Sequence, residues 1–413
     1  MGVILGYLRL LRRRRVLVLW GAQALSVFGD RLYAMAVMWI AWEKSGAAAM
    51  GLVAVAESVP YIVLGTLGRR LVDRFASLRA LAGLDAARVL LVGLLPWVWH
   101  VSGTPGMLAF AAALGAAGAL FDPNLGALVP DLVQRDEVQA VNGLMDLTGR
   151  VARIAGPGAA GALLALMPTS VLFWLDAVTF AVSALALTAL ARTAHPAARD
   201  RAAPKVVKLS ARQLLRTHPA TGAAIGVHGA GIFAQAVALA MPALLADRLG
   251  AGAGAYGLVL ATTGAGALAG NLVAGNRRLP ARLPVVYCLA WALSGLLLAL
   301  NGAAQSLAVL LMIAAASGAV APFLGVTLAT HLSAFPPAGR RRLMSLDLTV
   351  IRTAGTVSML AVPALAAGSP GVGFWVGGLA TVAVSLSGAT LAWWWSRPAA
   401  ADVLPEAAEL SRD

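Results

Sequence analysis

The stretch GALFDPNLG at residues 118–126 and the stretch GAVAPFLG at residues 318–325 follow the same outline. In each, a glycine–alanine pair is followed by a proline and then by a leucine–glycine pair. A second match lies at a similar separation, because Asp-Leu-Thr occurs at 146–148 and again at 347–349. The offsets of 199 to 201 residues are close to half of the 413-residue chain. The repeat predicts two homologous halves, an arrangement found in carriers that move two helix bundles about a central site.

Both stretches lie in long apolar segments, and the composition indicates the class of protein. Apolar residues make up 60% of the chain and charged residues 12%, whereas soluble domains average about 45–50% and about 25%. So much apolar surface cannot be buried in one water-soluble core, and a membrane-spanning helix uses about 20 apolar residues. We therefore predict an all-α polytopic membrane protein with twelve transmembrane helices, since an isolated span in lipid must satisfy its backbone internally.

Breaks in hydropathy and the positions of basic residues define the expected topology. The spans are expected near residues 16–41, 47–68, 79–100, 105–128, 141–167, 170–192, 218–246, 253–275, 282–301, 305–331, 343–367 and 370–396. Nearly all Lys and Arg residues outside the spans fall in connections on the same side as the N-terminus, and such residues favour the cytoplasmic side of a membrane. We expect a bacterial inner-membrane protein with both termini in the cytoplasm.

A basic, proline-containing segment divides the chain near its middle. Residues 193–217 lack apolar periodicity and are predicted to be a cytoplasmic linker between an N-terminal six-helix bundle (1–192) and a C-terminal six-helix bundle (218–397). Residues 398–413 are expected to form a cytoplasmic tail. Linker and tail are too short for a signalling domain, which argues against a non-transporting membrane sensor.

Composition and motifs argue against several other functions. The net charge of +14 does not indicate nucleic-acid binding, since the basic residues alternate with membrane-length apolar segments instead of forming a soluble basic face. No GxxxxGK[ST] loop is present, so ATP is not the expected energy source. The single Cys288 and the lack of a Cys/His cluster argue against disulfides and against a metal site. We expect no enzyme activity and no cofactor.

Several motifs together resemble one known family. They are SVFGD at 26–30, GRRLVDR at 68–74, Asp85 with Arg88, FDPNLGALVP at 121–130, Asn142, Gly156-Pro157 with Gly161, and DAVTF at 176–180. This chain resembles the major facilitator superfamily, and within it the twelve-span branch that contains the enterobactin exporter and the macrolide-efflux-type permeases. The resemblance implies the major facilitator fold, a small-molecule substrate and proton-driven export, with an antiporter motif at Gly156, Pro157 and Gly161.

Two departures from that family concern its gating loop and its coupling residues. Arg69 stands where the gating loop normally has a glycine, four residues before Asp73. The fourth span, residues 105–128, contains no basic side chain, although proton-coupled drug antiporters of the family commonly have an arginine there.

Acidic residues within the predicted spans are candidates for proton coupling. Asp30 in the first span and Glu57 in the second fall near the middle of the membrane. Charges at that depth are costly unless they are paired or hydrated, and burial favours the protonated form of a carboxyl group. Either residue could therefore take a proton from outside and release it inside. The alternative is that they neutralise Arg31, Arg150 or Arg153 in fixed pairs.

Other polar and aromatic side chains in the spans are candidates for lining a substrate cavity between the halves. They are Arg31, Trp39, Arg150, Arg153, His228 and Arg352. Arg150 and Arg153 share a helix face and could bind an anionic group or switch against the acids, but Arg150 could equally form an intrahelical pair with Asp146. His228 could relay protons or be a hydrogen-bonded packing residue. Trp39 could instead anchor its helix at the membrane surface.

Charged groups at the cytoplasmic ends of the spans are candidates for a gate. They are Asp73, Arg74, Asp85, Arg88 and Asp146. Salt bridges among them are expected to close the cytoplasmic side in the outward-facing state. The alternative is a set of hydrated charges that contribute about 0–1 kcal/mol each.

The glycines and the proline of the fifth span have a physical role of their own. Gly156 and Gly161 allow helix backbones to approach closely, and Pro157 removes one backbone hydrogen bond and permits a bend. We expect a joint that closes tightly against the opposite bundle, and small-residue packing without motion is the alternative.

The favoured function is export of a hydrophobic or amphipathic small molecule, such as a drug, natural product or siderophore, in exchange for protons. We expect a monomer whose partners are this substrate, protons and the lipid bilayer. Uptake by symport, or translocation of a lipid or lysolipid, on the same scaffold is the alternative. The antiporter-like fifth span argues against uptake.

Overall fold

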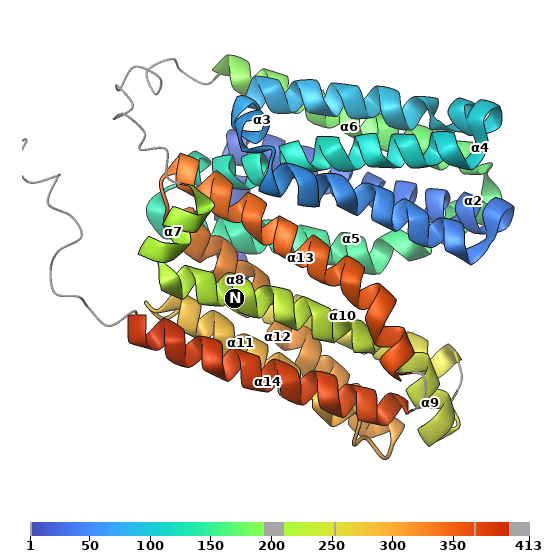
Figure 1. Cartoon of the computed structure of the whole chain (residues 1–413). Helices are drawn as coiled ribbons and strands as arrows, with labels where there is room; N and C mark the ends of the chain where they lie inside the picture. The colour runs from blue at the N-terminus through green and yellow to red at the C-terminus, as the bar shows by residue number, and fades with distance from the viewer. Residues whose placement is uncertain (1, 194–209, 252, 367–368, 396–413) are drawn as a thin grey trace, which may run out of the picture.

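The computed structural model describes residues 2–193, 210–251, 253–366 and 369–395, and every regular element in these ranges is a helix (Figure 1). The elements of the first half are α1 (Gly2–Leu11), α2 (Arg14–Thr66), α3 (Arg69–Arg74), α4 (Leu78–Leu128), η1 (Val129–Leu132), η2 (Arg135–Glu137), α5 (Val138–Leu166) and α6 (Thr169–Thr193). Those of the second half are α7 (Ala211–Thr217), α8 (Pro219–Gln235), η4 (Ala236–Ala240), α9 (Met241–Leu249), α10 (Ala253–Asn276), α11 (Leu283–Asn301), α12 (Leu307–Ser333), α13 (Pro337–Ala366) and α14 (Pro370–Trp395). The prediction of an all-helical protein is confirmed for this part of the chain.

Two helices of the first half are too long for one membrane crossing. α2 has 53 residues and α4 has 51, whereas a helix needs about 20 residues to cross the hydrocarbon core. α4 contains a kink at Gly103, whose φ of +57° lies in the region that residues with a side chain rarely adopt. α2 contains two separate apolar segments, Arg14–Ala41 and Ala49–Thr66. Each of these helices is therefore long enough for two crossings.

Nine segments of the described residues are long and apolar enough to cross a membrane. α5 and α13 are also long, with 29 and 30 residues, but they carry charges such as Arg153 and Arg352. Large apolar side chains such as Leu166 (80% exposed) and Trp97 (65% exposed) lie on the outer surface, which indicates contact with lipid. A multi-pass membrane protein is therefore confirmed, whereas the count of twelve spans stays a prediction.

The helices of the two halves form two groups (Figure 1). α2, α4 and α6 pack on one another in the first half, and α8, α11 and α14 do so in the second. α5 contacts α10 and α12, and α13 contacts α2 and α4, so these two helices join the halves. The predicted domain boundaries stay a prediction, because most of the predicted linker and all of the predicted tail (398–413) lie outside the described residues.

The two ends of the helix groups serve as reference points for the site. α3 and α7 lie at one end and α9 lies at the other (Figure 1), and we call these the α3 end and the α9 end. Each half has its own apolar core. Val92, Phe173 and Phe180 are buried together in the first half, and Leu310 and Phe374 in the second. These cores hold the more polar helices α5 and α13 at the interface between the halves.

Candidate functional site

Arginines at the start of α13 join the two halves at the α3 end. The buried Arg340 donates a hydrogen bond of 2.5 Å to the carbonyl of Ala127 and forms an ion pair of 3.1 Å with Asp131. Arg341 and Arg342 lie 3.7 and 3.8 Å from the carboxylate oxygens of Asp73. Every one of these contacts connects α13 of the second half to the first half.

Neutral side chains form a second layer of contacts between the halves. Asn142 on α5 lies 3.3 Å from both the Thr330 and the Ser333 hydroxyl oxygens of α12, to which its amide donates. Asn271 on α10 donates to Asp146 at 2.8 Å and to the carbonyl of Gly143 at 3.1 Å. With the arginines, these bonds place a dense polar contact between the halves toward the α3 end.

The predicted gate residues fall into different places. Asp73 and Asp146 lie in contacts that join the halves, whereas the side chain of Arg74 is exposed. Asp85 and Arg88 lie in the interior of the first half, where their 3.2 Å ion pair links two turns of α4. The pairing partners of Asp73 were not predicted. A run of three arginines on the same predicted side of the membrane is the only sequence signal for them.

Carboxylates in the first half gather around one arginine. Asp85 accepts hydrogen bonds from Arg88 and from Ser183, the latter at 2.6 Å. The Arg88 guanidinium also lies over two aromatic rings, 4.6 Å from the centre of Phe121 and 5.2 Å from the centre of Phe180. Two further acids, Asp30 and Asp122, are charged neighbours of the same guanidinium. The cluster therefore contains more acidic groups than basic ones.

The predicted coupling residue Asp30 faces the interface between the halves. It lines a cavity of about 390 Å³ together with Arg88, Asp122 and Asp146, and the second half contributes Met344 to the wall. Asp30 thus connects the acid cluster to a space that both halves enclose.

Asp176 on α6 belongs to this acid cluster and was not among the predicted site residues. It is fully buried, it is a charged neighbour of Asp30, and it accepts a hydrogen bond of 3.1 Å from Thr179 through one oxygen only. A Cβ at Gly29 would collide with the side chains of Asp176 and Thr179, so a larger residue there would displace them. The DAVTF motif was the available signal, since Asp176 is an acid within an apolar span.

Glu57 lies in a second polar group, which contains a basic residue from the opposite half. Its neighbours are Tyr33 on α2 and Arg352 on α13. The Arg352 guanidinium lies 4.4 Å from the centre of the Tyr61 ring, and the Tyr61 hydroxyl donates a 2.6 Å hydrogen bond to Asp122. The two predicted coupling acids are thus parts of adjacent groups, joined through Tyr61 and Asp122.

The arginines of α5 have different environments. Arg150 donates to both oxygens of Asp146, at 2.6 and 3.1 Å, and to the Ala321 carbonyl at 2.7 Å, so the intrahelical pair is present. The exposed Arg153 lines a cavity of about 500 Å³ between α5 and α10. Arg31 packs against Gly156, where a Cβ would collide with its side chain.

The remaining predicted residues are dispersed. His228 lies 2.7 Å from Asp347 and beside the rings of Tyr287 and Trp291, a geometry that suits either a packing role or a proton relay. The exposed fraction of Trp39 is 48%. Space is open around Gly161, and the side chain of Pro157 lies outside the described residues.

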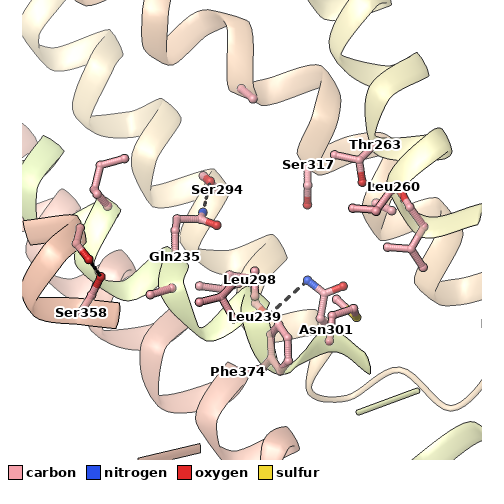
Figure 2. A pocket seen from close by; sticks show the side chains of 18 of the residues that line it. Gln235, Leu239, Leu260, Thr263, Ser294, Leu298, Asn301, Ser317, Ser358 and Phe374 are labelled. Atoms are coloured by element: carbon pink, nitrogen blue, oxygen red, sulfur yellow. Dashed lines mark hydrogen bonds between the residues drawn. The ribbon is translucent and has the colours of Figure 1, made fainter. Parts of the chain in front are cut away.

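A large cavity that was not predicted lies within the second half (Figure 2). Its volume is about 560 Å³, and none of the described residues that line it carries a charge. Leu239, Leu298 and Phe374 form part of the wall, and Gln235 donates a 3.0 Å hydrogen bond to Ser294 at its side. The neutral residues that line it gave no signal in the sequence, because they resemble those of any apolar span.

Comparison with known proteins agrees with this arrangement. The sequence matches the Major Facilitator Superfamily over residues 19–234, just over half of the chain. The multidrug efflux pump Tap of Mycobacterium tuberculosis is 26% identical over 177 residues, which cover 41% of this chain and 42% of Tap, and Tap of Mycobacterium bovis matches equally. The match thus spans less than half of the length of these relatives.

Solved structures show the same fold at low identity. A bacterial homologue of the iron transporter ferroportin in its outward-facing state has a TM-score of 0.72 at 15% identity, covering 93% of this chain and 99% of that chain. The human organic anion transporter MFSD10 has a TM-score of 0.70 at 15% identity, with coverage of 92% and 99%. The fucose:proton symporter FucP of E. coli has 0.65 at 12% identity, with coverage of 96% and 100%.

The long apolar helices, the two groups that meet through α5 and α13, the sequence match and these shared folds agree with one another. The chain belongs to the Major Facilitator Superfamily and is a multi-pass membrane transporter, not an enzyme.

Proposed function

We propose that this transporter exports a hydrophobic or amphipathic small molecule in exchange for protons. It does so as a monomer by alternating access, with twelve spans in two six-helix bundles (1–192 and 218–397). The similarity to the efflux pump Tap supports export. The exporter and macrolide-efflux branch is the proposed place within the family, and a bacterial inner membrane with both chain ends in the cytoplasm is the proposed setting.

The observation that carries proton coupling is the excess of carboxylates around Arg88. Asp30, Asp85 and Asp122 all have this guanidinium as a charged neighbour, and Asp176 adds another acid beside Asp30. Neighbouring like charges disfavour each other's ionisation, so we assign the coupled proton to the cluster as a whole and not to one residue. Because Asp30 lines the cavity between the halves, movement of the halves changes the access of that proton.

Glu57 is the second proposed coupling residue. Its charged neighbour Arg352 comes from the opposite half, so a change in the distance between the halves changes the stability of the Glu57 carboxylate. When Arg352 is close, its positive charge favours the ionised form of Glu57. When the halves move apart, the protonated form of Glu57 becomes more favourable. Rocking and proton binding are thereby linked.

The polar contacts at the α3 end are the proposed latch of the outward-facing state. Asp73 with Arg341 and Arg342, and Asp131 with Arg340, hold α13 against the first half. The structural likeness to a transporter solved in the outward-facing state supports the assignment of this conformation. Positive charge favours the cytoplasmic side, and the latch is rich in arginine, so we place the α3 end in the cytoplasm.

Acridine-orange fluorescence in everted vesicles tests the proposal. With respiration acidifying the lumen, addition of a transported compound should release protons and restore fluorescence in vesicles that contain the protein. Vesicles with Asp30→Asn should show no such recovery. Proton-driven export would be rejected if no compound of the panel gave a recovery of fluorescence that depends on the protein. It would also be rejected if vesicles with Asp30→Asn recovered as much fluorescence as those with the unchanged protein.

A further inference from the structure

Positive charge exceeds negative charge where α2 and α5 face the second half. Arg31, Arg150 and Arg153 are neighbours, and two acids lie near these three arginines: Asp146 beside Arg153, and Asp30 beside Arg31. Arg150 already binds both oxygens of Asp146. Among the residues that the structure describes, no carboxylate forms an ion pair with Arg31 or with Arg153, and the buried Nε of Arg31 has no hydrogen-bond partner.

Unpaired arginines inside a membrane protein are costly, and they mark sites where an anion binds or passes. The local structure maintains this arrangement. Gly156 has no side chain, and a Cβ there would collide with Arg31, so glycine lets α5 approach α2 and keeps Arg31 near Arg153. The surplus charge is therefore held in place by the packing of two helices.

The arginines border a cavity that adjoins the cavity of the second half. Arg150 and Arg153 line the cavity of about 500 Å³ between α5 and α10. Leu260 and Thr263 on α10 line this cavity and also the cavity of about 560 Å³ within the second half. Because the two cavities share these wall residues, they adjoin each other at α10.

The second-half cavity differs from the first in chemistry. Its described lining carries no charge, and it combines apolar side chains such as Leu298 and Phe374 with the hydroxyls of Ser317 and Thr263 (Figure 2). Pockets of roughly 300–1,000 Å³ with apolar walls and a few polar groups bind small organic molecules. This cavity therefore suits an uncharged, largely apolar body.

We propose that the cargo is an amphipathic organic anion. Its negative group binds Arg153, with Arg31 and Arg150 adding positive potential, and its apolar body extends past Leu260 and Thr263 into the second-half cavity. This proposal rests on the proposed export function and specifies the charge and orientation of the cargo. The negative group can belong to a soluble molecule or to a lipid headgroup, since both supply the same chemistry.

Binding of three pyrene probes to the purified full-length protein in phosphatidylcholine nanodiscs tests the charge preference. Pyrenebutyrate, pyrenebutanol and pyrenebutylamine share one apolar body and are anionic, neutral and cationic at neutral pH. Empty nanodiscs provide the correction for partition into lipid. We expect pyrenebutyrate to bind at least about tenfold more tightly than the other two, since hydrogen bonds to charged groups stabilise strongly.

Matched variants locate the two ends of the probe. Arg153→Gln should weaken pyrenebutyrate binding about tenfold and leave pyrenebutanol unchanged, whereas Arg153→Lys should retain most of the affinity. Arg135→Gln, in the exposed η2 segment, is the control and should change neither. Ser317→Phe should weaken both probes by the same factor. If that variant does not fold, energy transfer from Trp291, which lines the cavity, to bound pyrene reports the same location, and Trp291→Phe should reduce it.

Added phosphatidylglycerol distinguishes the source of the anion. Competition with pyrenebutyrate indicates a lipid headgroup, and no competition indicates a soluble anion. Equal affinity for the three probes, or an equal loss of all three in Arg153→Gln, would overturn the proposal. Because binding is measured without a pH gradient, such a failure leaves proton-driven export intact, and an uncoupled carrier would still show the charge preference.

Discussion

Replacing Arg340 with glutamine should open the α3 end more strongly than Asp73→Asn does. The Arg340 side chain is only 7% exposed and donates a 2.5 Å hydrogen bond to a backbone carbonyl of α4. It also pairs at 3.1 Å with Asp131, whose side chain is 47% exposed, so the carbonyl bond is the stronger of its two contacts. Asp73 is 34% exposed, and its contacts to Arg341 and Arg342 are 3.7 and 3.8 Å long. The structure therefore ranks Arg340 as the main element of the latch and Asp73 as a weaker one.

The two contacts differ enough in free energy to be distinguished. A hydrogen bond to a charged group contributes about 1.5–3 kcal/mol, whereas a partly hydrated ion pair contributes about 0.2–1 kcal/mol. Arg340→Gln should therefore change the ratio of closed to open α3 ends by about 10- to 150-fold. Asp73→Asn should change it by no more than about fivefold.

Distances between spin labels on the two halves measure this ratio. Labels replace Arg79 and Arg278, which are exposed, in a background with Cys288→Ala. Arg74→Gln, in the same short helix as Asp73 and exposed, is the control and should leave the distance distribution unchanged. If Arg340→Gln leaves the distribution as it is, or if Asp73→Asn shifts it further, the arginine cluster is not the latch.

Three other outcomes are expected. Asp30→Asn should abolish export driven by a pH gradient while retaining substrate binding, and the exposed Asp136→Asn should retain both; full gradient-driven export in Asp30→Asn would return this acid to a packing role. Gly156→Val should lower the thermal unfolding midpoint, since the valine side chain would displace Arg31 from a tight contact, whereas Gly161→Val, with open space around it, should change the midpoint little. A tag within residues 195–210 should react only from the cytoplasmic side, and reaction from outside would reverse the proposed topology.

The sequence predicted the helices better than it predicted the contacts between them. Hydropathy indicated the long helices, because the composition of a span is a local property. The break that separates the third and fourth predicted spans coincides with the kink at Gly103. The short helix α1 was not predicted, because its position depends on a contact with a distant part of the chain. The Tyr7 hydroxyl donates a hydrogen bond of 2.9 Å to the Asn271 side chain on α10.

The contacts of the candidate site could not be predicted either, because they too join residues that lie far apart in the sequence. Asp73 was identified from its motif, but its partners Arg341 and Arg342 lie more than 200 residues away in the sequence. Nothing in the local sequence distinguishes these two arginines from the other basic residues expected on the cytoplasmic side. The pair of Asp146 with Arg150 was one of the two alternatives that the sequence left open for Arg150, because residues four apart share a helix face. The second-half cavity could not be foreseen, since residues from eight elements form its wall and each of them is ordinary in an apolar helix.

The direction of flux in proteoliposomes tests proton-driven export most directly. Proteoliposomes that contain the purified protein hold a labelled substrate from the compound panel at equal concentration inside and outside. A pH gradient of either sign is then imposed. The proposal predicts net movement of the substrate against the direction of proton flow, reversal when the gradient is reversed, and no movement in the double variant Asp30→Asn with Glu57→Gln. Movement of substrate in the same direction as protons, or equal movement in the double variant, would contradict it.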